Sequence, residues 1–155
     1  MPSTARVPWM TRNRLLKLDF ASPPRPIQHA SALVVVASHH LRRLIATQLC
    51  RAGYQVGEAR DGSEGIDRVR RCHPNIVVID SMLPDVSGID FCRTLRQDPG
   101  GSDPYVLLLL DEEDEHQLFE AFEAGLDDYV TRPFRPWSLF SRLAAGERIL
   151  RLQTT

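Results

Sequence analysis

The sequence lacks the features that mark several large classes of protein. It has three cysteines among 155 residues, an odd number without a CxxC pair, which argues against a disulfide framework or a cysteine-rich metal site. No apolar run approaches the length of a membrane span, and the basic N-terminus has no apolar segment of the kind found in secretory signal peptides. We therefore expect a cytoplasmic protein without a membrane span.

Charge is nearly balanced overall but unevenly distributed. The net charge is −1, yet residues 1–30 carry five basic residues and one acid, whereas the remainder carries 14 basic and 19 acidic residues. The segment SPPRP at 22–26 is typical of a linker. We expect a flexible, basic, Pro-rich extension at 1–30, a folded domain at 31–152 and a short tail at 153–155. Contact of the extension with nucleic acid or a membrane surface is the remote alternative to a solvated extension.

From residue 31 onward, short apolar runs alternate with helical patterns. Strands are expected at 32–36, 54–59, 75–80, 105–110 and 127–131. Helices are expected at 39–52, 61–72, 86–97, 113–125 and 135–152. Five strand–helix units joined by right-handed crossovers predict an α/β domain with a flavodoxin-like, doubly wound, five-stranded parallel sheet of order 2-1-3-4-5 and five helices.

The helical spacing also predicts which side chains face the core. The apolar positions of the first helix are Leu41, Leu44, Ile45, Leu49 and Ala52. Cys50 and Cys92 fall within helical patterns and are expected to be buried thiols. We assign Phe122 and Phe140 to the core as well, because large aromatic side chains are mostly buried.

The stretch NIVVIDSMLPDVSG, at residues 75–88, contains the leading candidate for a functional residue. Its apolar run ends on an acid, Asp80, which costs free energy in a buried setting unless the carboxylate has a partner. In doubly wound sheets, sites lie beyond the carboxyl ends of the strands, at the switch point between strands 1 and 3. Asp80 ends strand 3 and therefore lies where a site is expected.

Three segments carry a resemblance to a known family: LCRAGYQVGEARDGSEGID (49–67), IVVIDSMLPDVSGIDFCRTLR (76–96) and FEAGLDDYVTRPF (122–134). From about Ala32 to Leu150, the chain resembles the CheY-like receiver domain of two-component response regulators. The resemblance implies an aspartate that accepts a phosphoryl group from a histidine kinase. It also implies two acids and a backbone carbonyl that hold Mg²⁺, a Thr or Ser and a Lys that bind phosphate, and an aromatic residue in strand 5.

The phosphoacceptor position of the family matches Asp80, but the metal ligands around it are largely missing. The backbone carbonyl would come from Met82, since a main-chain carbonyl is present whatever the side chain is. The two acids at the end of strand 1 correspond to Val36 and Ala37, and neither side chain can ligate a metal. We therefore expect no metal and no other cofactor, with Mg²⁺ bound only if non-standard ligands replace these acids.

The phosphate-binding positions have changed too. Leu110 stands at the hydroxyl position and Arg132 at the lysine position, whereas Tyr129 keeps the aromatic residue of strand 5. We hypothesise that Asp80 pairs with Arg132 through two hydrogen bonds, in a pocket made apolar by Val36, Ala37 and Leu110. Such a pair would hold the switch in one state without phosphate.

Other residues near the strand ends are weaker candidates for metal ligands. The acids of DEEDE at 111–115 are interpreted as the first turn of a helix, where the helix dipole favours them. Asp85 lies in the loop after strand 3. The neighbouring His39 and His40 point in different directions on a helix and are interpreted as solvated.

Receivers of this family usually signal through the face formed by helix 4, strand 5 and helix 5. The corresponding residues here are Phe119, Asp127, Asp128, Tyr129, Trp137 and Arg142. Asp127 or Asp128 facing Arg142 across a two-fold axis would support a homodimer.

The sequence favours a signalling module over an enzyme, because a hydrolase with Asp80 as nucleophile would need a second acid and a cap segment that are not found. The leading interpretation is an atypical pseudo-receiver, a phosphorylation-independent protein-interaction or dimerisation module. The alternative is a working phosphoprotein, modified on Asp80 by a histidine kinase with non-standard metal ligation. Expected partners are a histidine kinase or an output protein, and the chain is expected to be a stand-alone receiver or a piece of a longer protein.

Overall fold

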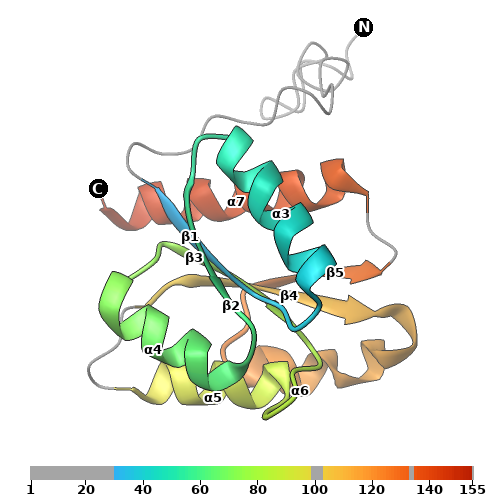
Figure 1. Ribbon diagram of the computed structural model, residues 1–155. Coiled ribbons are helices and arrows are strands. Elements are labelled where there is room, and N and C mark those ends of the chain that lie inside the picture. Colours follow the sequence, from blue (N-terminus) through green and yellow to red (C-terminus); the bar gives the residue numbers. More distant parts are fainter. Residues whose placement is uncertain (1–29, 99–102, 133–134, 155) are drawn as a thin grey trace, which may run out of the picture.

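The computed structural model describes residues 30–98, 103–132 and 135–154, with the side chains of residues 136, 137, 151, 153 and 154 left out. The predicted extension at 1–30 thus lies outside the described residues except for Ala30. The five strands are β1 (Ser31–Val35), β2 (Gln55–Ala59), β3 (Ile76–Asp80), β4 (Tyr105–Asp111) and β5 (Asp128–Arg132). They form one parallel sheet of order β2-β1-β3-β4-β5, which confirms the predicted doubly wound topology (Figure 1).

Five α-helices of the described part cover both faces of this sheet. The helices are α3 (His39–Arg51), α4 (Gly62–Cys72), α5 (Gly88–Gln97), α6 (Leu118–Glu123) and α7 (Pro136–Thr154). Figure 1 shows α3 and α7 on one face and α4, α5 and α6 on the other. Three of the helices begin at side-chain caps, because the side chains of Ser38, Asp61 and Ser87 accept hydrogen bonds from backbone amides of the first turn.

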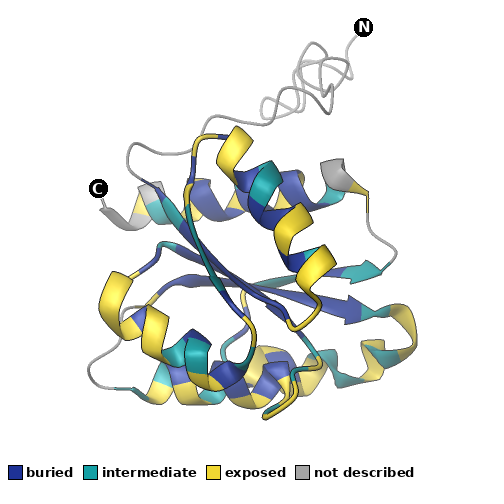
Figure 2. Cartoon of the chain, viewed as in Figure 1, coloured by how far each residue is buried: buried dark blue, intermediate teal, exposed yellow. Residues whose placement is uncertain are grey.

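The sheet lies between two hydrophobic clusters (Figure 2). One cluster joins alternate strand residues to α3 and α7, and the other joins the remaining strand residues to α4, α5 and α6. All five residues of β3 are buried, because a parallel sheet covered on both faces requires near-continuous apolar strands. Among the described residues, no helix combines the length and hydropathy that a membrane crossing requires.

The buried face of the first helix includes the predicted Ile45, Leu49 and Ala52, but it is not identical to the predicted face. Leu44, assigned to the apolar face, is 50% exposed, whereas Arg42 is buried. Arg42 tolerates burial because backbone carbonyls and an acid accept its hydrogen bonds. The expected burial of Cys50 is also wrong, since this thiol is exposed near the end of α3.

Other core predictions have a mixed outcome. Cys92 and Phe140 are buried as expected, and burial raises the pKa of the Cys92 thiol to about 12. Phe122 is 44% exposed, so its assignment to the core is wrong. The expected single helix at 113–125 is instead a 3₁₀ segment, η1 (Glu112–Gln117), followed by the six-residue α6.

Candidate functional site

Three strand ends meet at the carboxyl edge of the sheet, where the fold places its sites. Asp80, Asp111 and Arg132 are the last residues of β3, β4 and β5. Asp111 is in register with Arg132, and Asp80 is in register with Leu109, two residues before Asp111. The sheet order therefore brings an acid, a second acid and a cation to neighbouring strand ends.

Asp80 and Arg132 form the expected pair. Arg132 Nη2 donates to Asp80 Oδ1 at 2.7 Å, and Nη1 donates to Oδ2 at 3.3 Å. Asp80 is only 7% exposed, and the backbone N–H of Met82 donates to its Oδ1 at 3.2 Å. The pKa of Arg132 is raised, chiefly by its hydrogen bond to Asp80. The guanidinium therefore neutralises a nearly buried carboxylate through two parallel hydrogen bonds, a geometry that a lysine cannot provide.

A second carboxylate holds the same guanidinium. Arg132 Nε donates to Asp111 Oδ1 at 2.9 Å. Sequence reasoning interpreted Asp111 as part of an acidic first helical turn and did not connect it with Arg132. The missed signal was positional, because both residues end neighbouring strands.

The two matched positions at the end of strand 1 provide no metal ligand from their side chains. Val36 is fully buried in the cluster under α3 and α7, and Ala37 is exposed. Leu110 is fully buried in the opposite cluster, so the expectation of one apolar pocket lined by these three residues is wrong. Successive side chains of a strand point to opposite faces of the sheet, so residues at the ends of two strands can lie in opposite clusters. The side chains at these two positions offer no oxygen ligand, which Mg²⁺ prefers.

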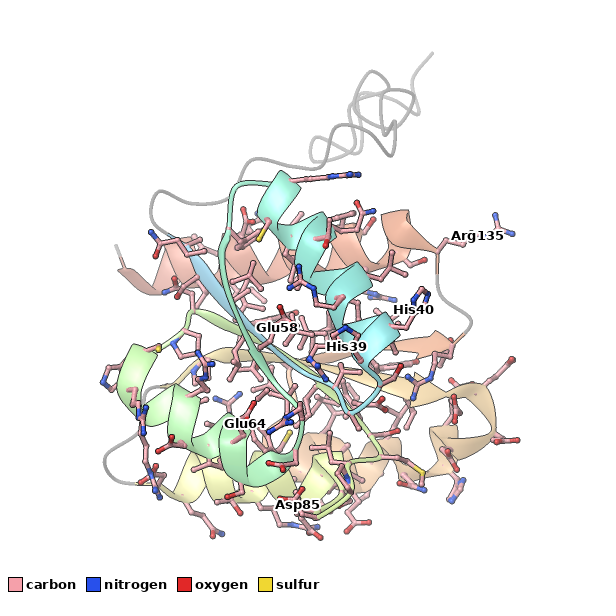
Figure 3. The ribbon with its side chains drawn as sticks, viewed as in Figure 1. His39, His40, Glu58, Glu64, Asp85 and Arg135 are labelled. Atoms are coloured by element: carbon pink, nitrogen blue, oxygen red, sulfur yellow. The ribbon has the colours of Figure 1, made fainter. Side chains whose placement is uncertain are left out.

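A second arginine lies at the end of β1. Arg42 Nη1 donates to the carbonyls of Val36 and Ala37 at 2.9 and 3.3 Å. Its Nε donates to Glu58 Oε1 at 3.1 Å, and its Nη2 lies 3.1 Å from His39 Nδ1 (Figure 3). A cation therefore contacts the backbone at the positions where the family would place metal-binding acids. Sequence reasoning missed this role because Arg42 lies beside apolar residues that predicted a different buried face.

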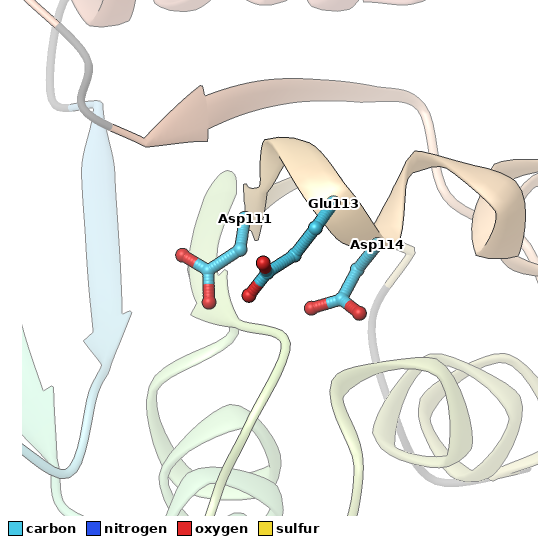
Figure 4. A group of neighbouring side chains, drawn as sticks. All are labelled: Asp111, Glu113 and Asp114. Atoms are coloured by element: carbon cyan, nitrogen blue, oxygen red, sulfur yellow. The ribbon is translucent and has the colours of Figure 1, made fainter.

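Figure 4 shows three acids of β4 and η1 pointing to the same side. The carboxylate oxygens of Asp111, Glu113 and Asp114 lie within 4.8 Å of one another, so the group is geometrically able to hold a cation. Asp111 is already paired with Arg132, however. Exposed acidic groups of this kind are common in proteins without a metal.

The other weaker candidates have local roles. Asp85 accepts the backbone N–H groups of Gly62 and Ser63 at 2.8 and 3.0 Å, at the first turn of α4 (Figure 3). These contacts, led by that with Gly62, lower the pKa of Asp85. His40 is exposed at the start of α3. Asp85 is therefore engaged at a helix N-terminus.

The predicted interaction face carries exposed aromatic surface. Phe119 is 76% exposed, and Phe122 contacts Tyr129 edge-to-face with ring centroids 6.3 Å apart. The side chain of Trp137 lies outside the described residues. Among the described side chains of this face, Phe119 is the most exposed large apolar one, and α6 carries it.

The charged residues of this face have partners within the chain. Arg142 Nη1 donates to Asp128 Oδ2 at 3.4 Å. Asp127 Oδ2 accepts from Arg96 Nη2 and from the backbone N–H of Val106, both at 2.8 Å. Arg142 thus pairs with Asp128 within the chain, and Asp127 binds Arg96 and the backbone at the start of β4.

The sequence of the chain is similar to those of known proteins. The sequence profile of the family described as "Response regulator receiver domain" matches residues 32–144. The chain is 35% identical over 117 residues to "Probable transcriptional regulator ycf27" of Porphyridium aerugineum, covering 76% of this chain and 48% of that protein. It is 35% identical over 116 residues to "DNA-binding response regulator MtrA" of Mycolicibacterium smegmatis, covering 75% and 50%. The chain thus spans about half the length of these curated relatives.

Solved structures share the fold. A signal receiver domain of a signal transduction histidine kinase from Syntrophus aciditrophicus superposes with a TM-score of 0.70 at 25% identity, covering 77% of this chain and 90% of that one. The chemotaxis response regulator CheY4 of Vibrio cholerae gives a TM-score of 0.71 at 24% identity, covering 76% and 98%. The flavodoxin-like architecture is therefore shared by proteins whose sequences have diverged widely.

Proposed function

We propose that this chain, which belongs to the family of response regulator receiver domains, is a pseudo-receiver that signals through protein contacts without phosphorylation. Receiver domains are generally non-enzymatic modules of two-component signal transduction. The observation that carries the proposal is the pair between Asp80 and Arg132, which already supplies the phosphoacceptor position with a counter-charge. The switch would accordingly be set by residues of the chain itself.

Electrostatics support this proposal. A phosphoryl group on Asp80 would carry a multiple negative charge beside Asp111, with Arg132 as the matched cation. One unit-charge pair at 4 Å is worth about 4 kcal/mol at an effective dielectric of 20, so replacing the family's two metal-binding acids by Val36 and Ala37 is a large deficit. Phosphorylation would also have to disrupt two hydrogen bonds between Asp80 and Arg132.

The output of such a module would be a surface. The exposed Phe119 and the partly exposed Phe122, next to Tyr129, offer an aromatic patch on α6 and β5 for a protein partner. A histidine kinase or an output protein in the cytoplasm is the partner class that the family supports. The names of the relatives, a DNA-binding response regulator and a transcriptional regulator, are compatible with such a partner.

The decisive experiment measures phosphoryl chemistry at Asp80. The native protein is titrated with Mg²⁺ and beryllofluoride and then incubated with acetyl phosphate, with a receiver that has the usual acids as positive control. We expect no saturable beryllofluoride binding and no incorporated phosphate. Binding or incorporation that disappears in Asp80→Asn, and persists in the surface control Asp67→Asn, would overturn the proposal.

One observation favours the alternative of a working phosphoacceptor. The neighbouring carboxylates of Asp111, Glu113 and Asp114 offer oxygen atoms close to one another, and Asp111 contacts the same guanidinium as Asp80. If these acids replace the missing metal ligands, Mg²⁺-dependent phosphorylation of Asp80 should be lost in the double variant Glu113→Gln, Asp114→Asn. No phosphorylation in the native protein removes this alternative.

The oligomeric state forms a separate part of the proposal. A homodimer through α6, β5 and α7 would bury Phe119, which is now 76% exposed. Light scattering over a range of concentrations tests this directly, with Phe119→Ser as the interface variant and Leu44→Ser as a control for loss of exposed apolar surface elsewhere. A native protein that stays monomeric at high concentration would restrict the module to contacts with other proteins.

A further inference from the structure

We propose that Asp111 is a positioning residue that fixes the guanidinium of Arg132 on Asp80. The inference rests on the proposed function, because it names the residue that keeps the neutralising cation in place. Arg132 ends β5 and Asp80 ends β3, and the order of the sheet places β4 between them. The side chain of Arg132 thus passes the end of β4, where Asp111 receives its Nε–H at 2.9 Å.

The division of donors shows what this contact does. Arg132 uses Nε for Asp111 and both terminal nitrogens for Asp80. A guanidinium is planar and its donors have fixed directions, so fixing Nε on one acceptor restricts the plane in which Nη1 and Nη2 can point. Without Asp111, the same guanidinium could turn and present a different edge to Asp80. The contact at Nε therefore selects one of several possible ion-pair geometries.

The 3₁₀ segment η1, which follows β4, gives independent support for this role of Asp111. Asp111 stands at the N-cap position of η1 with extended backbone angles, φ −78° and ψ 143°. An aspartate there ordinarily accepts a backbone N–H of the first turn, which stabilises the helix. Here the side chain makes no capping hydrogen bond, and its carboxylate binds Arg132 instead. The pairing with Arg132 is thus preferred over an available local partner.

The parallel ladder fixes the relative positions of the two partners. Asp111 and Arg132 are in register on β4 and β5, and their neighbours Leu110 and Thr131 are in register as well. Their backbones are therefore held by strand pairing, and the contact needs no loop to adopt a special conformation. The described hydrogen bonds connect Asp111 to Asp80 through Arg132, which makes Asp111 a positioning residue.

The test uses nuclear magnetic resonance of the full chain. The Nε–H signal of Arg132 is identified by its loss in Arg132→Lys, and the backbone amide of Met82 reports on Asp80 because it donates to Oδ1. In Asp111→Ala we expect exchange of the Arg132 Nε–H with water to increase about tenfold, as for loss of one charged hydrogen bond, and the Met82 amide signal to shift. Asp111→Asn keeps an acceptor oxygen and should give intermediate values.

Glu113→Gln is the matched control, because it removes one charge from the same acidic group while the hydrogen bonds of Arg132 go to Asp80 and Asp111. Equal effects of Glu113→Gln and Asp111→Ala would overturn the positioning role in favour of general electrostatics. Unchanged Nε–H exchange in both Asp111 variants would overturn it as well. Either result leaves the beryllofluoride test of the native protein intact, so failure of this inference is distinguishable from failure of the proposed function.

Discussion

Two arginines at opposite edges of the sheet bind two aspartates each but do different work. At the edge where β4 begins, Arg96 contacts Asp103 and Asp127 and also donates to the backbone carbonyls of Pro104 and Gly125. At the carboxyl edge, Arg132 donates to two side chains, Asp80 and Asp111. The first arginine ties loops together, whereas the second neutralises an acid at the candidate site.

The difference between these two arginines shows which contacts of a cation contribute to stability. A backbone carbonyl that loses its donor stays in place and remains unsatisfied, which costs about 1–3 kcal/mol where it is buried. A partly exposed carboxylate such as Asp111 that loses its partner can instead be solvated, so an ion pair of this kind contributes little to stability, whereas the buried Asp80 cannot be solvated as easily. We therefore expect stability to depend more on Arg96 than on Arg132, and the chemistry of the site to depend on Arg132.

The largest expected effect belongs to Arg96→Ala. This change removes the donors to Gly125 and Pro104 and leaves Asp127 without its cation, so we expect a loss of about 3 kcal/mol in the free energy of unfolding. Urea unfolding followed by circular dichroism measures it. A loss below about 1 kcal/mol would contradict the structural role given to this arginine.

Arg42→Met tests whether the hydrogen-bond partners of an arginine, and not the edge of the sheet at which it lies, determine its contribution to stability. Arg42 lies at the carboxyl edge like Arg132 but donates to two backbone carbonyls like Arg96, so we expect a loss of about 2 kcal/mol. Arg43→Met is the control, since the exposed Arg43 also pairs with Glu58 and should change stability by only about 0.5 kcal/mol. Similar values for the two variants, measured by urea unfolding, would refute the distinction.

Arg132→Ala should have a moderate effect on stability and a clear effect on ion binding. The change leaves the buried Asp80 without its counter-charge, so we expect a loss of about 2 kcal/mol in the free energy of unfolding. Without the guanidinium, the carboxylates of Asp80 and Asp111 lose their counter-charge, and affinity for Mg²⁺ or Ca²⁺ should rise roughly tenfold or more. Isothermal titration calorimetry measures this, with Arg142→Ala as the control for net charge. Equal ion binding in native protein and Arg132→Ala would show that the arginine does not act as the resident cation.

The smallest expected effect concerns Asp85, whose pKa is lowered from its ordinary value of 3.8 by the amides of α4. A lowered pKa in the folded state stabilises the protein above pH 3.8, and this stabilisation is lost as the pH falls through the lower folded pKa. Asp85→Asn should therefore cost about 0.5 kcal/mol at pH 7 and progressively less in acid. Urea unfolding across this pH range provides the measurement, and a cost that grows towards acid would reverse the assigned sign.

The pairing of Asp80 with Arg132 was predictable because two family positions carried an acid and an arginine in place of an acid and a lysine. The roles of Asp111 and Arg42 were not. Asp111 lies in a stretch that was explained as an acidic helix start, and Arg42 lies in a helix whose apolar positions alone were assigned to the core. Contacts between residues 21 positions apart, such as Asp111 and Arg132, depend on strand register, which periodicity does not give to the residue.

By itself, the sequence determined the α/β class, the order of the strands and the position of Asp80 at the carboxyl edge, because hydrophobic periodicity and crossover handedness leave few alternatives. Only the tertiary structure decided that Val36 and Leu110 lie in opposite clusters, that Arg42 is buried while Leu44 is exposed, and that one guanidinium joins Asp80 to Asp111. The physical reason is that the pattern of apolar and polar residues in the sequence determines which side chains must be buried or paired. The geometry of the assembled sheet sets which partner lies within hydrogen-bonding distance.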